Sequence, residues 1–470
     1  MSEIVADVVI VGGGMAGLVA GARAGELGLS VVVLERGSEP HYPCNTRWSG
    51  GVLHIAYTDI MADSDRLLSA IERGSDGTAD QSQAGAIATN GGRFIEWLQE
   101  HGTSFVQTNV EWQQLILAPI RNIRGGLDWK DRGPDQLLDR LTKAVRHRGG
   151  QLVLGARAHS LVMNAGRCKG VTADVGGKTR TFAGHAVVLA DGGFQANLER
   201  LARHVAPKPR QVKQRGAATS FGDGLAMAEA VGAGVTALDK FYGHLLGRDA
   251  FGNDDVWPYP EVDALACAGM LVNRSGRRFL DEGGGGIVLA NALAKSDDPL
   301  GATIIFDAAI WNGPGRSARI PANPALTDAG GKLFVADRIE ELAEMAGLSP
   351  THLVASVRSY NDALASGSLG SLSPPRTTQK YEAMAIAAPP FHAIPVCAGI
   401  TYTMGGVLVD SCSRVVKPDG TVISGLYAAG SITGGLEGGA NAAYVGGLAK
   451  AGVQGLLAAE TIAQVHGTTV

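Results

Sequence analysis

Three glycines near the N-terminus have the spacing of a site that binds the pyrophosphate of a dinucleotide. Gly12, Gly14 and Gly17 follow an apolar segment, residues 7–11, and open a segment expected to be helical. Gly12 allows a tight turn, Gly14 lets backbone N–H groups approach a phosphate, and Gly17 lets the helix lie close to the sheet. The pyrophosphate would lie at the helix N-terminus, where unpaired amides and the helix dipole favour negative charge.

An acidic residue at the end of the next predicted strand completes this fingerprint. Glu35 directly follows the apolar segment 31–34. We expect its carboxylate to accept hydrogen bonds from ribose hydroxyls and to repel a 2′-phosphate, which disfavours NADP. Because FAD and NAD bind to the same kind of strand–turn–helix motif, this motif alone does not show which of the two cofactors is bound.

The composition favours a large protein that binds a small molecule. The chain has 470 residues, 45% of them hydrophobic, which is too long for one core and indicates two or three domains. The net charge is -4 and no basic stretch is dense, so nucleic acid is not an expected partner. No segment has the roughly 18 uninterrupted apolar residues of a membrane span. The first strand begins at once, so we expect a cytoplasmic protein without a membrane span.

The cysteines do not encode a second redox group. Five are scattered along the chain without CxxC or CxxCH spacing: Cys44, Cys168, Cys267, Cys397 and Cys412. Neither an iron–sulfur cluster nor covalent haem is therefore predicted, and disulfides are not implied. Electrons must reach or leave the protein through another partner, an acceptor that the sequence does not identify.

The pattern of apolar and turn residues predicts three segments of chain with different architecture. Helices are expected near 93–101 and 136–148. Four strands resembling a small antiparallel meander are then expected at 151–154, 158–163, 169–175 and 178–182, and a buried strand at 185–190. From about 241 to 398 the pattern is irregular, with a helix near 351–366, and the chain ends in a helix at 447–463. We therefore expect a first domain in two parts, 1–241 and 399–470, with residues 242–398 inserted between them.

Five further strings give the chain a family resemblance. They are CNTRWSGG at 44–51, GDG at 222–224, LVNRSGRRF at 271–279, TMGG at 403–406 and GLYAAG at 425–430. In this order they resemble the flavoprotein subunits of succinate dehydrogenases and fumarate reductases, over essentially the whole length. Within that family the chain looks most similar to tricarballylate dehydrogenase, and more distantly to 3-ketosteroid desaturases.

The resemblance implies non-covalent FAD in an α/β fold, a Rossmann-type FAD-binding domain with an inserted α+β capping domain that closes over the flavin. Closure would exclude water from the site. The residues expected to bind FAD are Gly12, Gly14, Ala16, Gly17, Glu35, Arg36, Asn45, Thr46, Arg47, Ser49, Gly50, Gly51, Ala158, Asp191, Gly192, Asp223, Gly430, Gly446, Gly447 and Leu448. We expect Cys44 to be an unreactive buried thiol, although a cysteinyl–flavin bond is conceivable, and Asp191 to make only local hydrogen bonds.

The chain departs from this family where the proton is transferred. Fumarate reductases carry an arginine, and ketosteroid desaturases a tyrosine, at the place that corresponds to Gly286. Glycine neither donates a proton nor binds a carboxylate, so physiological fumarate reduction is not expected. The family's histidine before the TMGG string is replaced by Tyr402, and its last arginine has no clear counterpart near Tyr444.

The remaining candidates for catalysis are therefore two phenols and a histidine–arginine pair. Tyr444 and Tyr402 are expected to polarise a carbonyl or to act as acid and base. His244 approximately matches a family histidine, and with Arg248, taken as one helical turn later, it is expected to bind a carboxylate. Arg47 is either structural in the flavin loop, which we favour, or a substrate contact.

These residues predict an FAD-dependent dehydrogenase that desaturates a C–C bond adjacent to a carbonyl, in a cyclic ketone or keto acid. A base would remove the α-proton, and hydride would leave the β-carbon for flavin N5. The substrate is expected to be a small carbonyl or carboxylate compound. Two alternatives are a tricarballylate-like polycarboxylate dehydrogenase, in which Arg47, Arg248 or Arg124 replaces the missing arginines, and a flavin protein that only transfers electrons.

Overall fold

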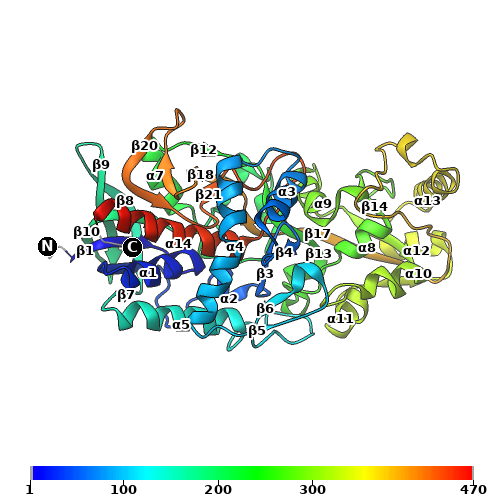
Figure 1. The fold of residues 1–470 in the computed structure, drawn as a ribbon. Helices are drawn as coiled ribbons and strands as arrows, with labels where there is room; N and C mark the ends of the chain where they lie inside the picture. Colours follow the sequence, from blue (N-terminus) through cyan, green and yellow to red (C-terminus); the bar gives the residue numbers. More distant parts are fainter. Residues whose placement is uncertain (1–3, 468–470) are drawn as a thin grey trace.

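The computed structural model describes residues 4–467, which form two lobes arranged along one long direction (Figure 1). The larger lobe holds both ends of the described chain, and the smaller lobe lies at the opposite end. In the larger lobe helices alternate with parallel strands, which confirms the α/β fold class.

The centre of the larger lobe is an eight-stranded sheet. Its parallel strands are β7 (Gln151–Val153), β2 (Val31–Leu34), β1 (Ile4–Val11), β10 (Lys178–Leu189) and β20 (Val422–Ala428), in this spatial order. β19 (Arg414–Val416) pairs antiparallel with β20 at the edge. Alternate residues of β1 enter different cores, since Val8 and Ile10 pack among helices while Val9 and Val11 face the other side. Both faces are buried, and this explains the unbroken apolar runs in these strands.

The predicted meander is partly wrong. β8 (Ala156–Asn164), β9 (Arg167–Val175) and β10 form the antiparallel ladder. However, β7 lies outside it and pairs parallel with β2, because α5 (Gly133–His147) forms a crossover between them. The strands expected at 178–182 and 185–190 are one continuous strand, β10, whose first half belongs to the ladder and whose second half belongs to the central sheet.

Each of the four helices that the sequence predicts overlaps a helix of the structure, three of them in the larger lobe and one in the smaller lobe. Residues 93–101 lie in the second half of α4 (Gln81–Glu100), 136–148 in α5, 351–366 in α13 (Pro350–Ala365) and 447–463 in α14 (Gly447–His466). α1 (Met15–Glu26) packs against α14, which runs across the larger lobe. Among residues 4–467, no helix has the length and apolar character needed to cross a membrane.

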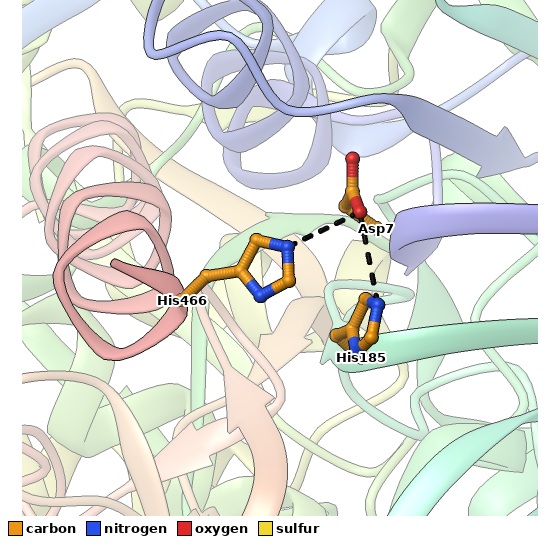
Figure 2. A group of neighbouring side chains, drawn as sticks. All are labelled: Asp7, His185 and His466. Carbon is orange, nitrogen blue, oxygen red and sulfur yellow. Dashed lines mark ion pairs between the residues drawn. The ribbon is translucent and has the colours of Figure 1, made fainter. Parts of the chain in front are cut away.

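One ion-pair cluster joins three elements at the outer end of the larger lobe. Figure 2 shows Asp7 of β1 between His466, at the end of α14, and His185 of β10. Asp7 Oδ1 lies 3.3 Å from His466 Nε2 and 3.9 Å from His185 Nε2, and Asp7 also accepts hydrogen bonds from Ser30. Burial alone would raise the pKa of Asp7, but the bonds from Ser30 and the two histidines hold it below its usual 3.8.

The smaller lobe is built around a second sheet. Its strands are β11 (Lys213–Gln214), β13 (Phe241–Gly247), β14 (Met270–Val272), β15 (Thr303–Asp307), β16 (Phe334–Ala336) and β17 (Phe391–Thr403). Its helices are α8 (Asp263–Ala268), α9 (Gly286–Lys295), α10 (Ala308–Asn312), α11 (Ala322–Asp328), α12 (Ile339–Ala346) and α13. The expected boundaries at 241/242 and 398/399 fall inside β13 and β17, which pair antiparallel. A two-stranded ribbon therefore connects the lobes.

Shorter elements complete the larger lobe. The remaining helices are α2 (Asn45–Trp48), α3 (Ser64–Gly74), α6 (Leu198–His204) and α7 (Asp223–Ala230). One small sheet contains β3 (Val52–Ile55), β4 (Thr58–Asp59), β5 (Phe105–Val106) and β6 (Leu115–Leu117). Another contains β12 (Val235–Thr236), β18 (Gly406–Leu408) and β21 (Thr433–Gly434).

Candidate active site

A cleft opens at the N-terminus of α1. Gly12 has a φ of +105°, and a Cβ there would overlap the Ala190 carbonyl. A Cβ at Gly17 would overlap the Gly12 carbonyl, whereas one at Gly14 would meet no atom closer than 3.6 Å. Gly12 and Gly17 therefore have the structural roles that the motif predicts, and Gly14 faces open space in the cleft.

Twelve of the residues expected to bind FAD line this cleft. They are Gly12, Gly14, Ala16, Glu35, Arg36, Asn45, Thr46, Ala158, Asp191, Gly192, Asp223 and Gly430. The other eight are not among the residues that line it: Gly17 lies in α1, Arg47 in α2, Ser49, Gly50 and Gly51 directly after α2, Gly446 before α14, and Gly447 and Leu448 in its first turn. Thr219, Ser220 and Phe221 also line the cleft, and no motif in the sequence indicated them.

Two buried carboxylates lie in the cleft. Glu35 accepts 2.7 Å hydrogen bonds from the N–H groups of Gly13 and Gly37, and burial raises its pKa above the usual value. Asp191 Oδ2 accepts from Gly224 N–H at 2.7 Å, a residue 33 positions away, so its bonding is not confined to its own turn as expected. Its Oδ1 is buried without a partner among residues 4–467, and burial raises its pKa to about 7. An unpartnered oxygen in this position calls for a donor from outside the chain, such as a hydroxyl of a bound cofactor.

The loop around α2 is fixed from both sides. Thr46 Oγ1 accepts from Met15 N–H at 3.0 Å, and Asn45 bonds to the Thr401 carbonyl and to Ala217 N–H. The Arg47 side chain is 1% exposed and pairs with two aspartates of α5, Asp135 and Asp139. These contacts favour the structural role for Arg47, since its charge is already neutralised.

The residues present fit FAD. The glycine turn and the α1 N-terminus suit a pyrophosphate, and Asp191 offers a buried acceptor. Arg36 and Asp223, 3.2 Å apart, close the far side of the cleft. Burial raises the pKa of Cys44 to about 11, so this thiol stays protonated at neutral pH and is a poor nucleophile.

Beyond α2, an aromatic cluster lies where the second lobe meets the N-terminus of α14. We define it by Tyr57, Tyr242, Tyr402, Tyr444 and His54. The Tyr444 ring stacks on Tyr242 at 4.0 Å and lies edge-on to His54 at 5.4 Å and to Tyr57 at 5.8 Å. Burial lowers the pKa of His54 to about 4, so its imidazole is neutral. The cluster brings together both tyrosines that the sequence predicted, in a setting suited to an uncharged ring.

The two predicted tyrosines have different partners. Tyr402 donates its proton to Glu437 at 2.9 Å, and Glu437 forms a fully buried ion pair with Lys450 at 2.7 Å. The Tyr444 oxygen instead accepts from Gly447 N–H at 3.3 Å, at the first turn of α14. Tyr444 can therefore donate its own proton, whereas the proton of Tyr402 is already used.

A chain of three side chains approaches the cluster from the second lobe. Asp263 Oδ2 lies 2.5 Å from His244 Nδ1, and His244 Nε2 lies 3.0 Å from the Tyr242 hydroxyl. Asp263 is held by Leu245 N–H at 2.7 Å. Burial raises the pKa of Tyr242 well above its usual value. Tyr242 and Asp263 were missed from the sequence, because no motif marks them and only the fold places them beside His244.

The absence of a side chain at Gly286 leaves room for the Asp263 side chain. A Cβ at Gly286 would overlap the Asp263 carboxyl group. A side chain at position 286 would therefore compete for space with the carboxylate that contacts His244. The lack of a side chain at position 286 therefore accompanies the contact between the Asp263 carboxylate and His244.

The other arginines predicted for the site lie elsewhere. Arg248 does not lie one helical turn from His244, because residue 244 is in strand β13 and Arg248 begins the next 3-10 helix, where it donates to the Leu300 carbonyl. The predicted His244–Arg248 pair is thus not formed. Arg124 is exposed in the loop after β6.

Comparison with known proteins finds FAD-binding relatives and a solved structure of similar fold. The FAD binding domain family matches residues 7–446. The chain is 26% identical to NADH:acrylate oxidoreductase of Vibrio harveyi over 93% of its own length and 48% of that protein, so it spans about half of that relative. It is 26% identical to 4-oxocyclohexanecarboxylate 2-dehydrogenase of Sinomonas cyclohexanicum over 97% of the chain and 92% of that protein. The 3-ketosteroid delta1-dehydrogenase structure from Sterolibacterium denitrificans superimposes with a TM-score of 0.76 at 20% identity, covering 98% of this chain and all of that one.

Fold and cleft together define a flavoprotein oxidoreductase. The chain belongs to the FAD binding domain family that includes fumarate reductases and ketosteroid dehydrogenases, as its motifs indicated. FAD is its cofactor, and it is an FAD-dependent oxidoreductase of the kind that acts on C–C bonds.

Proposed function

We propose that the protein desaturates a C–C bond adjacent to the carbonyl of a cyclic ketone or keto acid. The observation that carries this proposal is the chain Asp263–His244–Tyr242, which ends against Tyr444 in the aromatic cluster. FAD, when bound, accepts the two electrons and the hydrogen that leave the β-carbon. The residues of this chain must then bind the ketone and remove a proton from the α-carbon.

Tyr444 is suited to bind the ketone oxygen. Its own oxygen is held by an amide of the α14 N-terminus, so its O–H can point to a substrate carbonyl. Donation to that oxygen stabilises the negative charge that develops as the α-proton leaves. Tyr402, which is bonded to Glu437, is a positioning residue that packs beside the same helix terminus.

Tyr242 is suited to transfer the α-proton. Its raised pKa means that it does not ionise by itself at neutral pH. It can accept the α-proton only as it passes its own proton to His244 Nε2. Asp263 fixes the His244 tautomer and stabilises the charge that His244 then carries. Transfer in the opposite direction makes Tyr242 the acid of the reverse reaction.

The alternatives receive less support. A polycarboxylate needs cations at both ends of the substrate, and Lys450, the cation nearest Tyr402, is already paired with Glu437. A protein that only transfers electrons needs an open flavin edge. Here Tyr259, from the second lobe, lies against Gly50 of the loop after α2. The relative that acts on 4-oxocyclohexanecarboxylate and covers nearly the whole chain supports the ketone preference.

The test is anaerobic bleaching of the flavin in the purified holoprotein. We expect 4-oxocyclohexanecarboxylate or a related cyclic ketone to bleach it, and succinate and tricarballylate to leave it oxidised. In Tyr242→Phe the rate of bleaching should fall by about 10²–10⁴-fold with little change in substrate affinity. Tyr360→Phe is the matched control, because Tyr360 is a fully buried tyrosine of α13 that lies outside the aromatic cluster. Bleaching by dicarboxylates alone would overturn the proposal.

A further inference from the structure

Three arginines surround one tyrosine between the lobes. The guanidinium of Arg121 lies over the Tyr259 ring at 4.0 Å, and that of Arg215 lies over it at 4.6 Å. Arg319 reaches the same place from the loop before α11 and donates to the Gly50 carbonyl at 3.4 Å. Gly50 in turn lies beside the Tyr259 hydroxyl. The group joins the loop after β6, the second lobe and the loop that follows α2.

Only one of these three cations has a carboxylate partner. Arg215 forms an ion pair with Glu261 and donates to Thr401 Oγ1 at 2.9 Å. Within residues 4–467, no Asp or Glu oxygen lies within 4.0 Å of the guanidinium of Arg121 or Arg319. Two like charges therefore lie near each other without a direct ion pair, and Asp128 acts on Arg121 only from beyond 4.0 Å.

The same two arginines also have unused donors. Arg121 is 5% exposed, and its Nη2 donates to the Gly126 carbonyl at 2.8 Å. By hydrogen-bond geometry its Nε and Nη1 are buried without an acceptor among the described residues, as is Nη2 of Arg319, while the Tyr259 hydroxyl lies close enough to interact with the Arg121 guanidinium. Burial lowers the pKa of both side chains. A buried guanidinium without a counter-ion is costly, and a carboxylate that accepts two parallel hydrogen bonds is the partner that best matches its shape.

Contacts connect this group to the proton-transfer chain. Glu261, the partner of Arg215, lies 3.5 Å from His244 Nε2. Arg215 and Arg121 both lie over the Tyr259 ring. The unpaired arginines therefore lie at one end of a continuous series of side chains, and Tyr242 and Tyr444 lie at the other.

We propose that Arg121 and Arg319 form a subsite for a carboxylate of the substrate, remote from the carbon atoms that react. This assignment rests on the proposed function and narrows its substrate class to cyclic keto acids, with the ketone at Tyr444 and the acid group at the arginines. Arg215 does not share this role, because Glu261 neutralises it.

The experiment measures binding, not turnover, in the FAD-loaded protein. The probes are cyclohexanecarboxylate, which has the acid group but no ketone, and cyclohexanone, which has the ketone but no acid group. We expect Arg121→Met and Arg319→Met each to weaken cyclohexanecarboxylate binding about tenfold or more in calorimetric titrations. Cyclohexanone binding should change less than about twofold. Arg124→Met is the matched control, since Arg124 is exposed on the same loop as Arg121.

The outcomes separate the subsite from the reaction. If cyclohexanecarboxylate binds both variants as tightly as the wild type, the subsite is wrong, whatever the flavin does with ketones. If its binding is weakened but no ketone bleaches the flavin, the subsite stands and the desaturase proposal fails. Should Arg121→Met lose FAD or fail to fold, Arg319→Met and Arg121→Lys decide. The lysine variant keeps the charge but loses the bidentate geometry, so we expect intermediate affinity, and unchanged affinity in Arg319→Met would overturn the proposal.

Discussion

The buried ion pair between Glu437 and Lys450 provides a quantitative test of how the start of α14 is held together. Both side chains are fully buried, 2.7 Å apart, and Glu437 also accepts from Tyr402 O–H at 2.9 Å and Val445 N–H at 3.1 Å. Lys450→Met would remove the cation and leave a buried carboxylate. We expect a loss of about 3–5 kcal/mol in the free energy of unfolding, because an unpaired buried charge is far more costly than an absent pair.

The assay is urea denaturation of the holoprotein at a fixed excess of FAD. Glu437→Gln, Lys450→Met and the double variant are measured, and together with the wild type they form a double-mutant cycle. Glu437→Gln with Lys450→Met should be less destabilised than Lys450→Met alone, because a neutral amide replaces the buried carboxylate. The Glu460→Gln variant, whose carboxylate pairs with Arg23 and Arg93 nearer the surface, is expected to lose about 1 kcal/mol. A cost below about 1 kcal/mol for Lys450→Met, or additive effects in the cycle, would refute this reasoning.

Three further predictions concern separate parts of the molecule. Gly286→Arg should not create fumarate reductase activity; since its Cβ would displace Asp263 from His244, ketone-driven bleaching should fall at least tenfold in stopped-flow traces. Gly17→Ala should release FAD, measured as flavin lost on gel filtration, because the new methyl group would overlap a backbone carbonyl of the glycine turn. Asp7→Asn should lower the melting temperature by a few degrees or less at neutral pH. Because the pKa of Asp7 is depressed in the folded state, the difference in melting temperature from the wild type is fully present above pH 3.8 and disappears as the pH falls further. A constant difference down to pH 2 would show that Asp7 acts through packing instead.

The sequence by itself determined the cofactor cleft. The strand–glycine–helix motif is local, since Gly12, Gly17 and Glu35 lie within a single strand–helix–strand unit whose geometry depends on backbone conformation. The helices α5, α13 and α14 were located within a few residues of their bounds, whereas only the second half of α4 was predicted. The short strand β7 was misassigned, because whether it joins a parallel or an antiparallel partner depends on a crossover helix and not on its own residues.

Only the tertiary structure decided the chemistry of the substrate side. The paired strands β13 and β17 bring Tyr242 opposite Tyr402, although 159 positions separate them in the sequence. Asp263 reaches His244 because Gly286 leaves room for it, and Arg121 meets Arg319 only through the packing of the two lobes around Tyr259. These contacts link distant segments without a motif, so their residues carry no local signal. A cofactor site built on one backbone turn can be predicted from the sequence, because its residues are neighbours in the chain. A substrate site assembled from side chains of two lobes can be recognised only in the folded structure.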